Sequence, residues 1–107
     1  MGRKQGMEHT TLVVLSLLKR EDMYGYQMIA ELEKRFDPTF SMKEGTLYPV
    51  LKALENSGAV RSYLGKPTAG RERKYYHITE RGLRQLQEEE RQWRSYERSI
   101  NAVLNMG

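Results

Sequence analysis

The last quarter of the sequence can form a single helix that is longer than the preceding domain is wide. No proline occurs between Thr79 and Asn105, and threonine is a residue type that caps helix N-termini. About 26 residues at 1.5 Å each make a helix of roughly 40 Å, whereas a domain of about 80 residues is roughly 25–30 Å across. We therefore expect the far half of this helix to extend beyond the domain.

This extending half is still amphipathic. Leu86, Trp93 and Ile100 are spaced seven residues apart, and Tyr96 and Val103 each follow three residues after the latter two. The spacing is that of the a and d positions of a coiled coil, with one interruption. An apolar seam outside the domain needs a partner, and a second copy of the chain is the simplest one. The sequence therefore predicts a homodimer with these five residues in its interface.

The residues before Thr79 predict three helices followed by a two-stranded hairpin. Apolar residues recur with the period of a helix in three segments, and β-branched and aromatic residues gather in two shorter runs. Turn-forming residues fill the connection between those two runs, as in a hairpin with an open loop. The helices are expected at residues 10–20, 24–36 and about 42–57, and the strands at 59–65 and 73–78.

The third helix has the clearest local signals. Ser41 stands three residues before Glu44, which is the spacing of an N-terminal capping box. Gly58 follows the segment and suits the left-handed position that closes a helix. Pro49 lies inside the segment, where it removes one backbone hydrogen bond and is expected to bend the helix.

The excess of positive charge is confined to the hairpin. The net charge is +4 at pH 7, from 18 basic and 14 acidic residues. Residues 61–74 contain five Lys or Arg and one Glu, so their net charge is 5 − 1 = +4 and the rest of the chain is neutral. Charge concentrated in this way is typical of a surface that binds the phosphates of a polyanion, although an exposed loop can also collect it by chance.

Together these elements predict a mainly α protein with a small β-hairpin: a winged helix-turn-helix with a long C-terminal helix. We expect residues 1–79 to form a DNA-binding domain and residues 80–107 to form the dimerisation helix. In this architecture the third helix enters the major groove, and the hairpin, or wing, lies along the backbone or minor groove. The side chains expected to contact DNA are Ser41, Lys43, Thr46, Tyr48 and Lys52 near the third helix, and Lys66, Arg71, Arg73 and Lys74 on the wing. Tyr48 has a second interpretation, in which it covers the edge of the core.

Other classes of protein find no support in the sequence. There is no cysteine, and His9 and His77 form no metal-ligand pattern with nearby carboxylates. The glutamates at 88–90 are expected on a solvated helix face, and no nucleophile has a base beside it. The longest apolar run, residues 11–18, is shorter than the roughly 20 residues of a spanning helix. We expect a soluble cytoplasmic protein that is not an enzyme and uses neither metal nor cofactor.

Three motifs make the sequence similar to the PadR family of bacterial transcriptional regulators. Residues 44–55, EGTLYPVLKALE, resemble the family's recognition helix, and residues 70–82, GRERKYYHITERG, resemble its wing. Residues 24–26, YGY, match the usual start of its second helix, and the chain ends after one further helix, as in the short subfamily. The resemblance implies a homodimeric regulator, usually a repressor, on a two-fold-symmetric operator. It also implies that the last helix packs on helix one of the other subunit, which adds Leu12 and Leu15 to the interface, and that Tyr48 contacts a phosphate.

The resemblance also points to a candidate effector site, because some short members bind planar, often cationic, aromatic compounds in a channel at the dimer centre; the residues alone do not settle whether this chain binds one. Trp93 occupies the place of the tryptophan that walls this channel, and Glu97 lies one turn further on. Leu12, Leu15 and Ser16 would line the channel from helix one. Trp93 could equally serve only as packing in the dimer.

Two other functions stay open at this point. The fold could be a protein-interaction module that binds neither DNA nor an effector, in which case the chain would be a monomer without DNA retention at low salt. Basic wings with tyrosines can also stack on the bases of single-stranded RNA, and competition between duplex DNA and RNA separates that function from the first.

Overall fold

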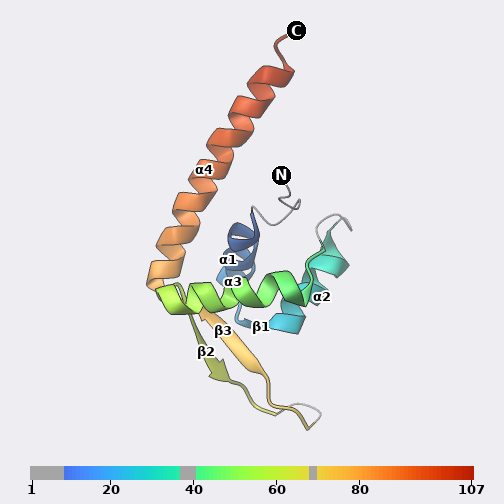
Figure 1. Ribbon diagram of the computed structural model, residues 1–107, viewed down its shortest axis with the longest axis vertical. Helices are drawn as coiled ribbons and strands as arrows, with labels where there is room; N and C mark the ends of the chain where they lie inside the picture. The colour runs from blue at the N-terminus through green and yellow to red at the C-terminus, as the bar shows by residue number, and fades with distance from the viewer. Residues whose placement is uncertain (1–8, 37–40, 68–69) are drawn as a thin grey trace.

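The chain folds into a helical body with a small antiparallel sheet and one long projecting helix (Figure 1). The computed structural model describes residues 9–36, 41–67 and 70–107. Along these residues the elements are α1 (Thr10–Arg20), β1 (Met23–Tyr24), α2 (Gly25–Arg35), α3 (Glu44–Ser57), β2 (Val60–Leu64), β3 (Lys74–Ile78) and α4 (Glu80–Leu104). This is the expected winged helix with a long C-terminal helix.

The sheet contains a short strand that the sequence did not predict. β2 and β3 form the expected hairpin, and β1 pairs with the other edge of β3, which gives the order β1-β3-β2. The expected helix from Tyr24 begins one residue later, at Gly25, because the Tyr24 backbone is extended (φ −90°, ψ 163°) and pairs with Tyr75. The N-terminus of α2 is thereby attached to the wing.

The core is centred on α1. Val14 and Leu15 of this helix are fully buried, as are Met28 of α2 and Leu47 and Leu51 of α3. The helix packs against α3, α4 and β3, so it lies between α3 and the long helix α4. Its observed bounds are those expected from the apolar pattern.

The capping box expected at Ser41 is not formed at the N-terminus of α3. The helix begins at Glu44 with Lys43 as its N-cap, and no side chain caps it. Glu44 is therefore the first helical residue and not the third, and Ser41 lies too far before the helix to reach the amide that a capping box serves. At the other end Gly58 has a φ of 86°, and the amide of Ala59 donates to the Leu54 carbonyl over 2.9 Å, which confirms the left-handed C-cap.

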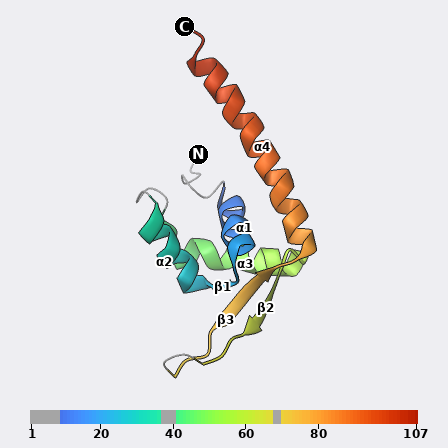
Figure 2. The same cartoon turned by 180° about the vertical axis from the view of Figure 1, so that it is seen from behind.

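The N-terminus of α4 has the expected cap. The Thr79 hydroxyl accepts a hydrogen bond from the Gly82 amide at 3.1 Å, and the same hydroxyl donates to the Gly58 carbonyl at 2.6 Å. From there the helix runs for 25 residues, and its far half projects away from the body at the end opposite the wing (Figure 2). The molecule is accordingly elongated, with extents of 59 × 29 × 27 Å.

Candidate nucleic-acid interface

The expected DNA-contacting residues of α3 lie on its solvent face. Lys43, Tyr48 and Lys52 are exposed and Thr46 is half-buried, while Ser41 is exposed just before the helix. The opposite face carries the buried leucines at 47, 51 and 54. The amphipathic pattern therefore orients α3 so that hydroxyl and ammonium groups point away from the core.

Tyr48 is both partly exposed, as expected of a DNA contact, and packed at the edge of the core, as the second interpretation expected. Its side chain is 42% exposed, yet its ring packs against Gly25 at the start of α2. A Cβ atom added at Gly25 would lie 2.7 Å from Cζ of the Tyr48 ring, closer than real Cβ contacts. Partial burial and the nearby charge of Glu44 raise the pKa of Tyr48 above its ordinary value of 10.0, so its hydroxyl stays protonated and can donate to an anion.

The wing carries its four expected basic residues in two different situations. Lys66, Arg71 and Lys74 are exposed, whereas Arg73 is half-buried. The ammonium of Lys74 is 3.8 Å from a carboxylate oxygen of Glu55 on α3, and the other oxygen of Glu55 accepts a hydrogen bond of 2.6 Å from Ser62 on β2. Glu55 therefore attaches α3 to both strands of the wing.

The inner half of the wing is also held by Asp22, in the turn between α1 and β1. One carboxylate oxygen accepts from the Tyr63 hydroxyl of β2 at 2.6 Å, and the other lies 2.9 Å from Nδ1 of His77 on β3. Since a carboxylate can only accept, His77 is the donor. Partial burial raises the pKa of Asp22, but the hydrogen bonds from Tyr63 and His77 lower it more, so the pKa lies below the ordinary value of 3.8.

The projecting half of α4 carries part of the predicted dimer seam. Tyr96, Ile100 and Val103 are 57%, 41% and 63% exposed, and Trp93 is half-buried. Leu86 and Leu15, also expected in the interface, are 4% and 0% exposed in the core of the same chain. These two residues therefore do not belong to the exposed seam, which begins at Trp93.

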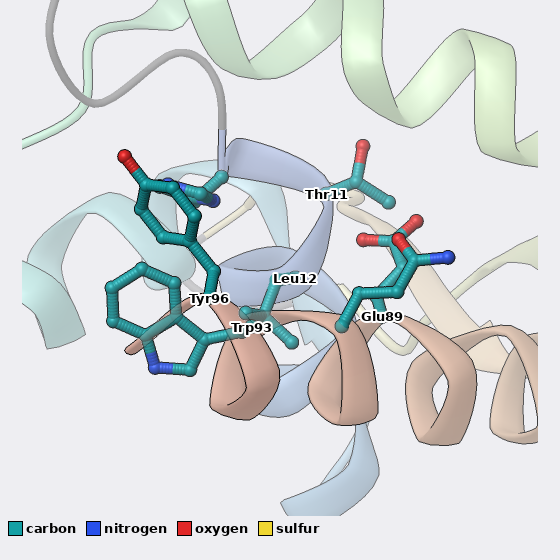
Figure 3. A pocket seen from close by; sticks show the side chains of 7 residues that line it. Thr11, Leu12, Glu89, Trp93 and Tyr96 are labelled. Atoms are coloured by element: carbon teal, nitrogen blue, oxygen red, sulfur yellow. The ribbon is translucent and has the colours of Figure 1, made fainter. Parts of the chain in front are cut away.

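A pocket of about 420 Å³ lies between the start of α1 and the middle of α4 (Figure 3). Trp93 and Tyr96 lie on one side of it and Glu89 on the other, with Leu12 between them in this view. The residues that line it are His9, Thr11, Leu12, Glu89, Gln92, Trp93 and Tyr96.

Only part of the expected effector site lies at this pocket. Leu12 and Trp93 line it, whereas Leu15 is buried in the core, and Ser16 and Glu97 are exposed elsewhere. The acid at the pocket is Glu89, which was expected on a solvated face but is half-buried and accepts from Gln85 at 2.9 Å. The heptad interruption at this position was the signal that could have identified it.

Neither a metal centre nor a membrane span is found in the described parts of the chain. Over residues 9–36, 41–67 and 70–107, no three His, Cys, Asp or Glu side chains gather as metal ligands would. No helix among those residues combines the length and the apolar character that crossing a membrane requires.

Comparison with known proteins agrees with this arrangement. Residues 14–88 match the model of the transcriptional regulator PadR-like family. An uncharacterized protein of Lysinibacillus sphaericus, protein X, is 34% identical over 96 residues, which cover 90% of this chain and 88% of that protein. The transcriptional regulator YqjI of Escherichia coli is 29% identical over 104 residues; the match covers 94% of this chain but 48% of YqjI, so this chain corresponds to about half of that relative. A crystal structure of a PadR-like transcriptional regulator from Bacillus cereus is similar with a TM-score of 0.81 at 29% identity, covering 95% of this chain and 98% of the other.

Proposed function

The chain belongs to the PadR-like family of transcriptional regulators, and from this we infer that it is a homodimer that binds a two-fold-symmetric DNA operator and represses transcription. The family consists of DNA-binding regulators and not of enzymes. In the proposed complex α3 enters the major groove, and the wing of each subunit lies on the backbone beside it. A planar aromatic effector bound between α1 and α4 would release the DNA.

One observation carries the DNA-binding part of this proposal. The segment that contains all of the net positive charge forms the wing, and the wing is joined through Glu55 to the helix that exposes Lys43, Tyr48 and Lys52. Lysine and arginine side chains that neutralise phosphates release condensed counterions, which is the main source of affinity for a duplex. A wing and a helix held together in this way offer such charges as one surface.

The exposed seam of α4 supports the proposed homodimer. Three large apolar side chains between residues 96 and 103 remain exposed on a helix that projects from the body. Burying them against a second copy removes apolar surface from water. Each Å² buried in this way stabilises the dimer by about 25 cal/mol. A dimer also presents two recognition helices, whose half-sites should lie about 10 base pairs apart.

The test is the salt dependence of DNA binding. Fluorescence anisotropy with a labelled mixed-sequence duplex should give affinities that fall steeply as salt rises. Arg71→Ala should reduce the slope of log K against log salt by about one, because one phosphate contact is lost. Arg98→Ala is the matched control, since Arg98 is exposed on the face of α4 opposite the seam and its loss changes the net charge equally.

Three results would contradict the proposal. Affinity that is independent of salt excludes a phosphate-binding surface. A monomer in sedimentation, together with no retention of duplex at low salt, favours the protein-interaction module instead. Preferential competition by single-stranded RNA would point to RNA as the ligand.

A further inference from the structure

Three tyrosines form a row across the sheet. The register pairs Tyr75 of β3 with Tyr24 of β1 on one side and with Tyr63 of β2 on the other, so all three point to one face of the sheet. The rings of Tyr24 and Tyr75 meet edge to face with centroids 5.4 Å apart, and those of Tyr63 and Tyr75 stack at 5.7 Å. This face is opposite to the one that buries Tyr76 in the core.

Arg73 lies over the Tyr24 ring, at one end of this row of tyrosines. Its guanidinium carbon lies 4.5 Å from the centroid of the Tyr24 ring, within the range of a cation–π contact. The guanidinium has five N–H donors, so those that do not face the ring remain available to an anion. Among the described residues no carboxylate pairs with Arg73. The Tyr24 ring therefore orients the Arg73 guanidinium, and no carboxylate among the described residues neutralises its charge.

The same tyrosine connects this arginine to the recognition helix. Tyr24 is followed directly by Gly25, and the ring of Tyr48 packs on Gly25 so closely that no side chain fits there. A continuous line of contacts thus runs from Tyr48 on α3 through residues 24 and 25 to Arg73 on the wing. Both ends of the line are expected DNA contacts.

We propose that Tyr24 is a positioning residue for DNA binding: its ring holds the Arg73 guanidinium in the orientation that meets a phosphate and fixes that group relative to Tyr48. The proposal rests on the proposed DNA-binding function. An arginine that is already oriented loses less rotamer freedom when it binds, and this difference strengthens the complex. Tyr24 itself needs no contact with the DNA.

The test is a double-mutant cycle read by binding of the full-length protein to a mixed-sequence duplex of about 30 base pairs at low salt. Tyr24→Leu removes the ring and should weaken binding about two- to fivefold, the size of a partly exposed cation–π contact. Tyr24→Phe keeps the ring and should bind like the unmodified protein. In an Arg73→Ala background, Tyr24→Leu should have no further effect on affinity.

A second measurement separates positioning from a purely structural role. Phenylalanine with increasing fluorination, incorporated at position 24, keeps the shape of the ring but weakens its attraction for a cation. DNA affinity should fall stepwise along this series but stay constant along the same series in the Arg73→Ala background, where no cation faces the ring. The series also decides the outcome if Tyr24→Leu fails to fold.

Each outcome has a defined meaning. Equal affinity along the fluorinated series, or an equal effect of Tyr24→Leu with and without Arg73, overturns the positioning role and leaves the DNA-binding function intact. Unchanged binding by Arg73→Ala overturns it as well, because there is then nothing to position. Absence of any duplex binding by the unmodified protein refutes the proposed function itself.

Discussion

Replacing Gly82 with alanine should destabilise this protein, although alanine is the better helix former. Gly82 is the third residue of α4, and in a solvated helix interior the change to alanine is worth up to about 1 kcal/mol in favour of the variant. Here a Cβ atom would overlap the carbonyl oxygen of Ala59 and would lie 2.7 Å from Cγ1 of Ile78. Carbon atoms in contact are normally about 3.5–4.0 Å apart, so α4 has to move by about 1 Å.

The movement disrupts the contacts that begin α4. The amide of Thr79 donates to the Ala59 carbonyl at 3.0 Å, and the hydroxyl of Thr79 donates to the Gly58 carbonyl at 2.6 Å. A shift of about 1 Å takes these hydrogen bonds out of range. Each lost bond lowers the free energy of unfolding by about 1 kcal/mol. Overpacking costs a further 1–3 kcal/mol or so. After subtraction of the helix propensity, Gly82→Ala should lower the free energy of unfolding by about 2–4 kcal/mol.

The matched control is the same substitution in another helix. Gly45 lies in the first turn of α3, and an added Cβ there meets nothing within 4 Å. Gly45→Ala should therefore stabilise the protein by about 0.4–1 kcal/mol. Equilibrium urea unfolding followed by circular dichroism compares both variants at one protein concentration, because the apparent stability of a dimer depends on concentration. A Gly82→Ala protein as stable as the unmodified one would refute the close approach of α4 to Ala59.

Three further predictions concern the wing, the seam and the pocket. Asp22→Asn should lower the urea midpoint at neutral pH, and its difference from the unmodified protein should shrink in acid. The pKa of Asp22 is lowered from 3.8, so the stability that its charge contributes is lost as the pH falls through the lowered value; a difference that does not shrink as the pH falls contradicts this. Ile100→Glu should shift sedimentation toward the monomer, whereas Arg98→Glu on the opposite face should not; equal behaviour of the two argues against the seam. Planar aromatic cations should quench Trp93, the single tryptophan, and Glu89→Gln should weaken their binding about threefold or more but leave neutral dyes unaffected; unchanged fluorescence with a broad panel assigns Trp93 to packing alone.

Elements whose signal is local were predictable from the sequence. The apolar pattern of residues 10–20 gives the observed α1, and Thr79 and Gly58 sit at the helix ends expected of their residue types. The capping-box prediction at Ser41 was wrong because spacing alone does not state where a helix begins. The segment with the excess of positive charge, residues 61–74, coincides with the hairpin that the strand and turn patterns predicted.

Periodicity could not assign apolar residues to a particular partner. Leu86 and Trp93 occupy equivalent heptad positions, yet Leu86 packs into the core of its own chain and the seam begins only at Trp93. The boundary depends on how far the body reaches along α4, which is a tertiary distance. The same reasoning applies to Gly82, where helix propensity suggests a weak point and the structure shows that only glycine allows α4 to approach Ala59.

The contacts that position the wing depend on a strand too short for any periodic signal. β1 has two residues, so neither alternation nor propensity distinguishes it from the first turn of a helix. Once Tyr24 pairs with Tyr75, its ring must lie on the face of the sheet that also carries Arg73, and Gly25 must lie beneath Tyr48. Pairing of one residue thus places two expected DNA contacts relative to each other. Residues such as Tyr24 are identified by the register of the sheet and not by a local motif. Their stabilising contacts are made with groups about 50 residues away in the chain.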